Sequence, residues 1–344
     1  MQTNHNLQIN IPITIITEGA AKVNIKTEST KNGTFSATEK WIDKKQKSIK
    51  IAEKLKLIGE FGRAERMKNC GDVLEYTYCA SCGEYHIKRA NLCRDRFCPA
   101  CSWRLSLQRY GEMKRLLINI ENAYPEVNEW SLITLTVKNC YTSDLHDTMQ
   151  KMSRAWNLAI SQRGVRPSLF GWARSVEVTY NEDTHELHPH YHILIGWWSN
   201  KSQELIRKWL EACRRYGLIA NIKAQNAQRI TYIKSSNDDL YETTEIPDTF
   251  TKAVLETFKY SIKGSDLEKM KVSEFREIVG QYSNKRLVAY GGKIKEYAKL
   301  LRIEAEQVID EDSPIKICKN CGSPDLEELI YKWSFGSNSY ELHK

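Results

Sequence analysis

Three histidines at alternate positions form the strongest chemical signal in the sequence. Residues 187–195 read LHPHYHILI, and their composition predicts a β-strand. Because successive side chains of a strand point to opposite faces, His188, His190 and His192 would share one face. Imidazoles gathered in this way are typical of a metal site. Surface histidines, or a stacked pair in the core, are the alternative interpretation.

A carboxylate on the preceding predicted strand completes this candidate metal site. If the two strands form a hairpin with its turn centred on residues 183–184, Glu177 lies opposite His190. A shift of one residue in the turn would place Glu177 opposite His192, and it shares the histidine face in both registers. Such a ligand set can hold a divalent metal with positions left open for a phosphate oxygen and water. The nitrogen and oxygen ligands favour Mn²⁺ or Mg²⁺, with His188 as an extra ligand or a phosphate contact.

A tyrosine and a glutamate form a second candidate catalytic group. Residues 255–263, LETFKYSIK, are predicted to be helical, so Glu256 and Tyr260 lie one turn apart and Lys263 stays on that side. A tyrosine can be a nucleophile, but its ordinary pKa of ~10 requires activation, which Lys263 or a metal would favour. Glu256 could act as a general base on the phenol or on a water. Since such pairs are common on helices, this pattern alone does not establish catalysis.

Ten cysteines provide a second indication of metal binding. Cys79-Ala-Ser-Cys82 and Cys98-Pro-Ala-Cys101 are separated by 15 residues, which is the spacing of a structural zinc site with four thiolates. We therefore predict that Cys79, Cys82, Cys98 and Cys101 bind zinc. Some neighbouring side chains could replace one member of this set, namely Cys70, Cys93 and His86.

The remaining cysteines give weaker indications. Cys318 and Cys321 form another CxxC pair, which is half a metal site and needs two ligands from elsewhere. Cys140 and Cys213 are predicted to be ordinary half-buried thiols.

Basic and aromatic side chains are interleaved near the CxxC pairs. Arginines next to aromatic rings suit phosphate contacts and base stacking, although a solvated basic face is the alternative. The predicted DNA contacts are Arg94, Arg96, Trp103 and Arg104.

The elements that must position these residues divide the chain into four regions. We expect a flexible arm at 1–40, a zinc-binding module with flanking helices that contacts DNA at 41–125, a catalytic domain at 126–280, and a C-terminal extension with the last CxxC at 281–344. Strands and helices follow one another in the catalytic region in the order β-α-β-β-α-β-α. This order predicts an α+β fold with a central antiparallel sheet and helices on one side.

The composition limits the class of protein. The 344 residues are 41% hydrophobic and 27% charged, as in an ordinary soluble protein, which excludes a membrane bundle and wholesale disorder. Lys and Arg number 51 against 43 Asp and Glu, and the resulting charge of +8 permits a nucleic-acid partner without requiring one. Closely spaced cysteines without a secretory pattern lead us to expect a cytoplasmic protein.

Four segments together resemble the HUH endonucleases, and among them the bacterial initiators of rolling-circle plasmid replication. His190-Tyr191-His192 resembles the histidine–hydrophobe–histidine motif of that superfamily. The segments occur in the same order as in those initiators. They are CRDRFCPACSW (93–103), LITLTV (132–137), EVTYN with HPHYHILI (177–195) and ETFKYSIK (256–263).

The resemblance implies a split-βαβ-like catalytic domain that nicks single-stranded origin DNA and later transfers and religates the strand. Tyr260 would attack a phosphodiester, which leaves a 5′-phosphotyrosyl bond and a 3′-OH that primes a host polymerase. The metal would polarise the scissile phosphate, and Lys263 would orient it. Glu256 matches members with one tyrosine, in which a glutamate activates the water that ends the reaction. Gly264 stands where relatives with two tyrosines carry the second one.

Two other functions remain open at this point. An HUH transposase or relaxase would use the same chemistry on the end of a mobile element. A zinc-finger DNA-binding regulator would leave a single strand intact. A host helicase and a host polymerase are the expected partners of an initiator, and no membrane is expected.

Overall fold

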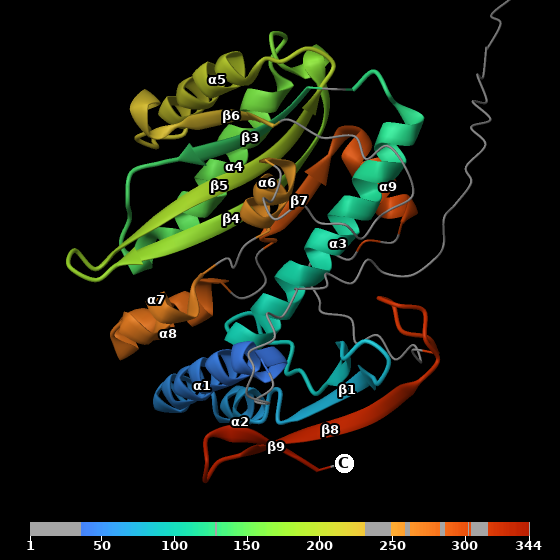
Figure 1. Ribbon diagram of the computed structural model, residues 1–344. Coiled ribbons are helices and arrows are strands. Elements are labelled where there is room, and N and C mark those ends of the chain that lie inside the picture. Colours follow the sequence, from blue (N-terminus) through green and yellow to red (C-terminus); the bar gives the residue numbers. More distant parts are fainter. Residues whose placement is uncertain are drawn as a thin grey trace, which may run out of the picture.

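The computed structural model describes residues 36–127, 129–230, 249–258, 262–282, 286–301, 303 and 316–343. These residues form two antiparallel sheets with flanking helices, which confirms the α+β class (Figure 1). The arm predicted for residues 1–40 lies almost wholly outside the described residues. Within the described ranges, no helix combines the length and the apolar character needed to cross a bilayer.

The larger sheet has five strands in the order β6-β3-β5-β4-β7. The strands are β3 (Glu129–Thr136), β4 (Leu169–Asn181), β5 (Glu186–Trp197), β6 (Asn226–Ile230) and β7 (Val288–Gly291). β4 and β5 form the predicted hairpin, in which Asn181 Oδ1 accepts hydrogen bonds from the backbone N–H groups of Asp183 and Thr184 at 2.9 and 3.1 Å. This turn sets the register that places Glu177 opposite His190.

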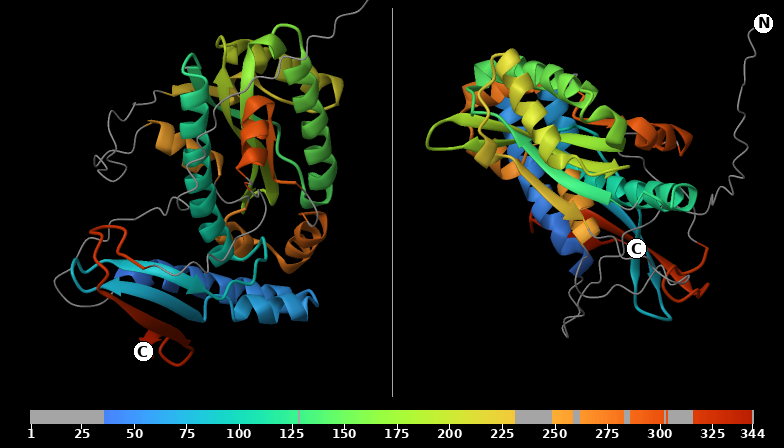
Figure 2. Two further views of the ribbon diagram at one scale, coloured as in Figure 1. Left: turned by 90° about the vertical axis from the view of Figure 1, so that its right-hand side faces the viewer. Right: turned by 90° about the horizontal axis from the view of Figure 1, so that it is seen from above.

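Helices cover both faces of the larger sheet, so the prediction of helices on one side is wrong (Figure 2). On the first face lie α4 (Leu145–Ser161) and α5 (Ser202–Arg215), with Trp156 and Trp209 fully buried in the same core as Tyr191. On the second face lie α3 (Pro99–Ala123), α6 (Thr249–Thr257) and α9 (Gly292–Leu300). The physical reason is that the sheet is apolar on both faces near its centre, where Phe170 and Leu194 bury against α3, α6 and α9.

The smaller sheet joins the two ends of the described chain. Its order is β2-β1-β8-β9, with β1 (Val73–Cys79), β2 (Tyr85–Ala90), β8 (Leu326–Ser334) and β9 (Ser339–Leu342). The whole length of β1 pairs with β8, from Val73 opposite Lys332 to Cys79 opposite Leu326. The expected extension at 281–344 is therefore divided, because β7 and α9 join the larger sheet while β8 and β9 complete the smaller one.

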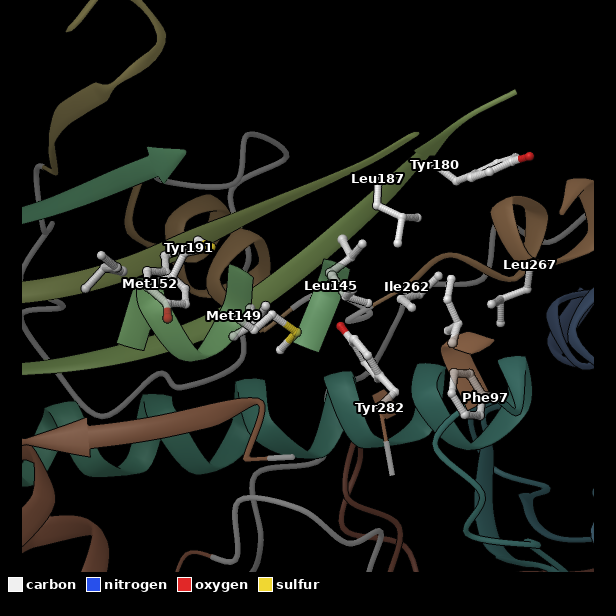
Figure 3. Packing of buried hydrophobic residues seen from close by; sticks show 14 of the residues in the cluster. Phe97, Leu145, Met149, Met152, Tyr180, Leu187, Tyr191, Ile262, Leu267 and Tyr282 are labelled. Carbon is white, nitrogen blue, oxygen red and sulfur yellow. The ribbon is translucent and has the colours of Figure 1, made fainter. Parts of the chain in front are cut away.

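Helices connect the two sheets. α1 (Ser36–Leu57) and α2 (Phe61–Lys68) pack on the smaller sheet, and α3 runs from there to the larger one (Figure 1). α7 (Gly264–Lys269) and α8 (Val272–Tyr282) lie between them, where Phe97 packs against Phe275 and Tyr282 (Figure 3). Three short 3₁₀ turns complete the described elements: Thr142–Asp144, Arg166–Ser168 and Ile222–Ala224. One continuous core thus extends from the first face of the larger sheet to α1.

Candidate active site

Glu177, His190 and His192 form a buried cluster on the second face of the larger sheet. Their ligand atoms all lie within 4.8 Å of one another. Glu177 Oε2 is 2.9 Å from His192 Nε2 and 3.4 Å from His190 Nε2. The alternation of the strand puts the two imidazoles side by side, and the hairpin register brings in the carboxylate. The predicted three-residue group is therefore assembled in the fold.

The donors and acceptors of this cluster are arranged so that a cation can lie between them. His190 Nδ1 lies 3.0 Å from the His188 carbonyl oxygen, which can only accept, so Nδ1 carries a proton. Nε2 therefore faces the Glu177 carboxylate, which can only accept. With a proton, Nε2 donates to this carboxylate; without one, a cation is needed between the two acceptors. Burial opposes ionisation of Glu177, but hydrogen bonds from His190 and His192 hold its pKa below its usual range. Between the histidine Nε2 atoms and the Glu177 carboxylate, this arrangement can hold either a proton, which makes a ring an imidazolium, or a divalent metal ion.

Two further side chains surround the histidines. Thr134 on β3 lies opposite His192, with Oγ1 3.3 Å from His192 Nδ1. His188 is not part of the cluster of ligand atoms, because its Nδ1 lies 2.8 Å from Asn139 Oδ1 instead. Burial, together with the neighbouring His190, lowers the pKa of His188. The possible role of His188 as an extra ligand is therefore not favoured by this arrangement.

Glu256 and Lys263 both reach this cluster, although not on one helix. Glu256 Oε1 on α6 is 3.6 Å from His192 Nε2, and Lys263 Nζ is 3.9 Å from Glu177 Oε1. α6 ends at Thr257 and Lys263 has no helical backbone, so the prediction of one helix over 255–263 is wrong at Lys263. Lys263 has extended backbone and directly precedes α7. Tyr260, the predicted nucleophile, lies outside the described residues.

Eight cysteines form two clusters, and the predicted grouping of Cys79 and Cys82 with Cys98 and Cys101 is wrong. The first group, which we call the helix cluster, lies at the start of α3 and consists of Cys70, Cys93, Cys98 and Cys101. The second, which we call the strand cluster, lies at the end of β1 and consists of Cys79, Cys82, Cys318 and Cys321. β1 is the reason for the split: Cys70 precedes this seven-residue strand and Cys79 ends it, which separates them by about 20 Å at ~3.3 Å per residue.

The sequence contained a sign of the second cluster. Once Cys140 and Cys213 are set aside as isolated thiols, eight cysteines remain, which is enough for two complete sets of four. In the helix cluster the sulfur atoms of Cys70 and Cys101 lie 3.5 Å apart, and Cys98 occupies the position that precedes α3. The backbone N–H groups of Cys93 and Arg94 point at sulfur atoms of this cluster.

The residues predicted to contact DNA have different surroundings. Arg94 is exposed, whereas Arg96 Nη1 donates to the Tyr282 carbonyl oxygen at 2.5 Å and thereby joins the loop before α3 to α8. Trp103 packs edge-on against Trp41 with ring centroids 5.1 Å apart, and the Arg104 guanidinium lies over both rings. Arg96, Trp103 and Arg104 thus also stabilise the fold around the helix cluster.

Comparison with known proteins identifies the family of the chain. The model of the family described as "Replication protein" matches residues 84–341. A "Protein rep" of Lactiplantibacillus plantarum is 25% identical over 91% of this chain and 97% of its own length. The "Protein rep" of Streptococcus pneumoniae serotype 2 is 27% identical over 76% and 80% of the two chains.

A third relative, from Bacillus amyloliquefaciens, is 28% identical over 88% of this chain and 93% of its own. No solved structure gives a significant match. The family match covers both cysteine clusters except Cys70, Cys79 and Cys82, and it includes the cluster of Glu177, His190 and His192. The chain therefore belongs to this family of replication proteins, as its resemblance to the rolling-circle plasmid replication initiators predicts.

Proposed function

We propose that the protein starts rolling-circle replication of a plasmid by nicking one strand of the origin through a tyrosine nucleophile. The observation that carries the proposal is the buried group of Glu177, His190 and His192, with Glu256 and Lys263 at its edge. A divalent metal bound by these three side chains would polarise a phosphate oxygen. The donor set of nitrogen and oxygen atoms suits Mn²⁺ or Mg²⁺.

In the proposed nicking step, Tyr260 is the nucleophile and Lys263 holds the phosphate. The Tyr260 hydroxyl oxygen would attack the scissile phosphorus and form a 5′-phosphotyrosyl ester. The bond from phosphorus to the 3′ oxygen would break, and that oxygen would take up a proton as the 3′-OH that a host polymerase extends while a host helicase unwinds the duplex. Lys263 would hold a non-bridging phosphate oxygen, because its ammonium already lies next to the anionic Glu177.

Glu256 has a separate proposed role at the end of the cycle. Its carboxylate is one-third exposed and lies beside His192, so a water could reach it without displacing the buried cluster. As a general base, Glu256 would take a proton from the water that ends the reaction and releases the enzyme. Strand transfer and religation precede this release.

Structural zinc is the second part of the proposal. Four thiolates in the helix cluster fit a closed tetrahedral site, in which backbone N–H groups and the start of α3 stabilise the negative charge. This ion would hold the loop that carries Arg94 and Arg96 in place for phosphate contacts.

The proposal is tested with a labelled library of single-stranded oligonucleotides, in Mn²⁺ or in EDTA. We expect a covalent protein–DNA band on a denaturing gel that requires the metal and disappears in Tyr260→Phe, because phenylalanine has no nucleophilic oxygen. The matched control is Tyr216→Phe, since Tyr216 follows α5 at the opposite face of the larger sheet and should leave the band unchanged.

Two outcomes would contradict this assignment in different ways. A band that survives in Tyr260→Phe would mean that another group is the nucleophile. Intact strands under all conditions, together with retained binding, would favour a DNA-binding regulator over a nuclease.

A further inference from the structure

We propose that the strand cluster is a second structural zinc site, which fastens the C-terminal hairpin of the chain to β1. The helix cluster and the active site both lie elsewhere, so this site is independent of the nicking reaction proposed above. Its ligands would be Cys79 and Cys82 from one end of the chain and Cys318 and Cys321 from the other.

The two halves of the strand cluster are built alike. Cys79 and Cys318 each donate their backbone N–H to the carbonyl oxygen five residues later, at 2.9 and 2.7 Å. Gly83 and Gly322 each donate to the carbonyl of the first cysteine of their half at 2.8 Å. Both glycines have a left-handed backbone, with φ of +75° and +72°, which other residues rarely adopt. Two turns of the same design thus present two sulfur atoms each.

The sulfur positions match a tetrahedral zinc site. Zn–S bonds of about 2.3 Å place the sulfur atoms of a tetrahedron about 3.8 Å apart. The Cys79–Cys321 and Cys82–Cys318 sulfur atoms are 3.6 Å apart, and all four lie within 4.8 Å. These distances are far longer than a disulfide bond of about 2.05 Å. Four thiolates packed this closely would repel one another without a cation, since each carries a negative charge.

The neighbours of the strand cluster support thiolate ligands. The backbone N–H of Asn320 donates to Cys318 Sγ at 3.4 Å, and the buried His86 places Nε2 3.5 Å from the same sulfur. Hydroxyl groups of Ser81 and Ser323 join the two turns at 2.7 Å. The two halves are therefore held together by protein contacts as well as by the proposed ion.

Metal analysis of the full-length protein tests the site without reference to activity. After removal of loosely bound ions, we expect two zinc ions per chain in the wild type and one in Cys318→Ser/Cys321→Ser. The control is Cys140→Ser/Cys213→Ala, which also removes two cysteines but should keep two ions. Loss of the helix-cluster ion in Cys98→Ser/Cys101→Ser would leave one ion in the strand cluster.

Alkylation of the wild-type protein provides a measurement that does not depend on the folding of variants. We expect Cys318 and Cys321 to resist iodoacetamide until zinc is removed with a strong chelator, because a zinc-bound thiolate is a weaker nucleophile. A zinc content that is the same in Cys318→Ser/Cys321→Ser as in the wild type would overturn the proposal. So would rapid alkylation of both cysteines in zinc-loaded protein, or a disulfide between the two halves.

Discussion

At the scale of single residues, the candidate active site consists of two histidines that face the carboxylate of Glu177. The His188 carbonyl fixes the proton of His190 on Nδ1, which leaves Nε2 to face Glu177. His192 is oriented in a corresponding way by Thr134 on the neighbouring strand. Side chains that orient a metal ligand usually affect metal affinity as much as activity. Thr134 is therefore a positioning residue that can be tested by itself.

We expect Thr134→Val to weaken Mn²⁺ binding by about tenfold, because valine keeps the shape of the side chain but removes its hydroxyl oxygen. Thr134→Ser should restore most of the affinity, since it keeps that oxygen. Isothermal titration calorimetry on the protein without DNA measures this directly. Equal affinities for the valine variant and the wild type would show that Thr134 does not orient His192.

Several of these residues could be predicted because a short-range rule applied. The alternation of a strand was enough to place Glu177 on the histidine face, and the structure has the register with the turn centred on residues 183–184, in which Glu177 lies opposite His190. Lys263 was placed for the wrong reason, since the rule assumed a helix that ends at Thr257. It reaches Glu177 from the start of α7, by a tertiary contact that helical spacing does not describe.

At the scale of elements, a buried lysine holds α1, α2 and β1 together. Lys45 is 1% exposed, and its Nζ donates to the carbonyl oxygens of Lys68 and Cys70 and to the carboxylate of Asp72. These acceptors lie on the segment that joins α2 to β1, which includes the first ligand of the helix cluster. Lys45 is therefore a support for the proposed zinc site as well as a packing contact.

Lys45→Met should reduce the free energy of unfolding by about 2–3 kcal/mol, because the buried acceptors lose their donor while the methionine fills the space. Lys47→Met on the same helix is the control, since its exposed ion pair with Asp43 should contribute under about 1 kcal/mol. Urea denaturation at a fixed zinc concentration measures both. A loss for Lys45→Met no greater than that for Lys47→Met would contradict the supporting role.

The elements also explain why the cysteine grouping was predicted wrongly. The rule for CxxC pairs assumes that two pairs close in sequence share an ion. Here β2 lies between them and runs back along β1, so Cys79 and Cys98 end up at opposite ends of β1 and in different clusters. Nothing in the local sequence indicates that Cys318 and Cys321 complete the cluster that contains Cys79 and Cys82. Their placement depends on the pairing of β8 with β1, which is a contact between distant parts of the chain.

At the scale of the whole molecule, the positive charge predicts strongly salt-dependent DNA binding. The chain carries +8, and each phosphate contact to a single strand changes the slope of log K against log salt by about −0.7. Exposed Arg94 is a proposed phosphate contact, so Arg94→Ala should make the slope less steep by about that amount. Fluorescence anisotropy with a labelled oligonucleotide at several salt concentrations measures the slope.

The control for this experiment is Lys208→Ala, because Lys208 lies on α5 at the opposite face of the larger sheet and pairs with Glu211. Its slope should equal that of the wild type. An unchanged slope for Arg94→Ala would show that Arg94 does not contact a DNA phosphate.

At the scale of the whole molecule, the sequence predicted the family and the antiparallel sheet. It did not predict the helices on both faces of the larger sheet or the pairing of β8 with β1, because both depend on long-range packing.

The pairing of β8 with β1 has a consequence for synthesis of the protein. β8 lies between β1 and β9, so the edge of β1 that β8 occupies has no strand partner from this hairpin until β8 has been synthesised. A chain that stops early can build the larger sheet but lacks the strands and two of the cysteines that complete the smaller one. Such a fragment would hold the group of Glu177, His190 and His192 beside an unfinished smaller sheet. Completion of the smaller sheet therefore follows synthesis of every strand of the larger one.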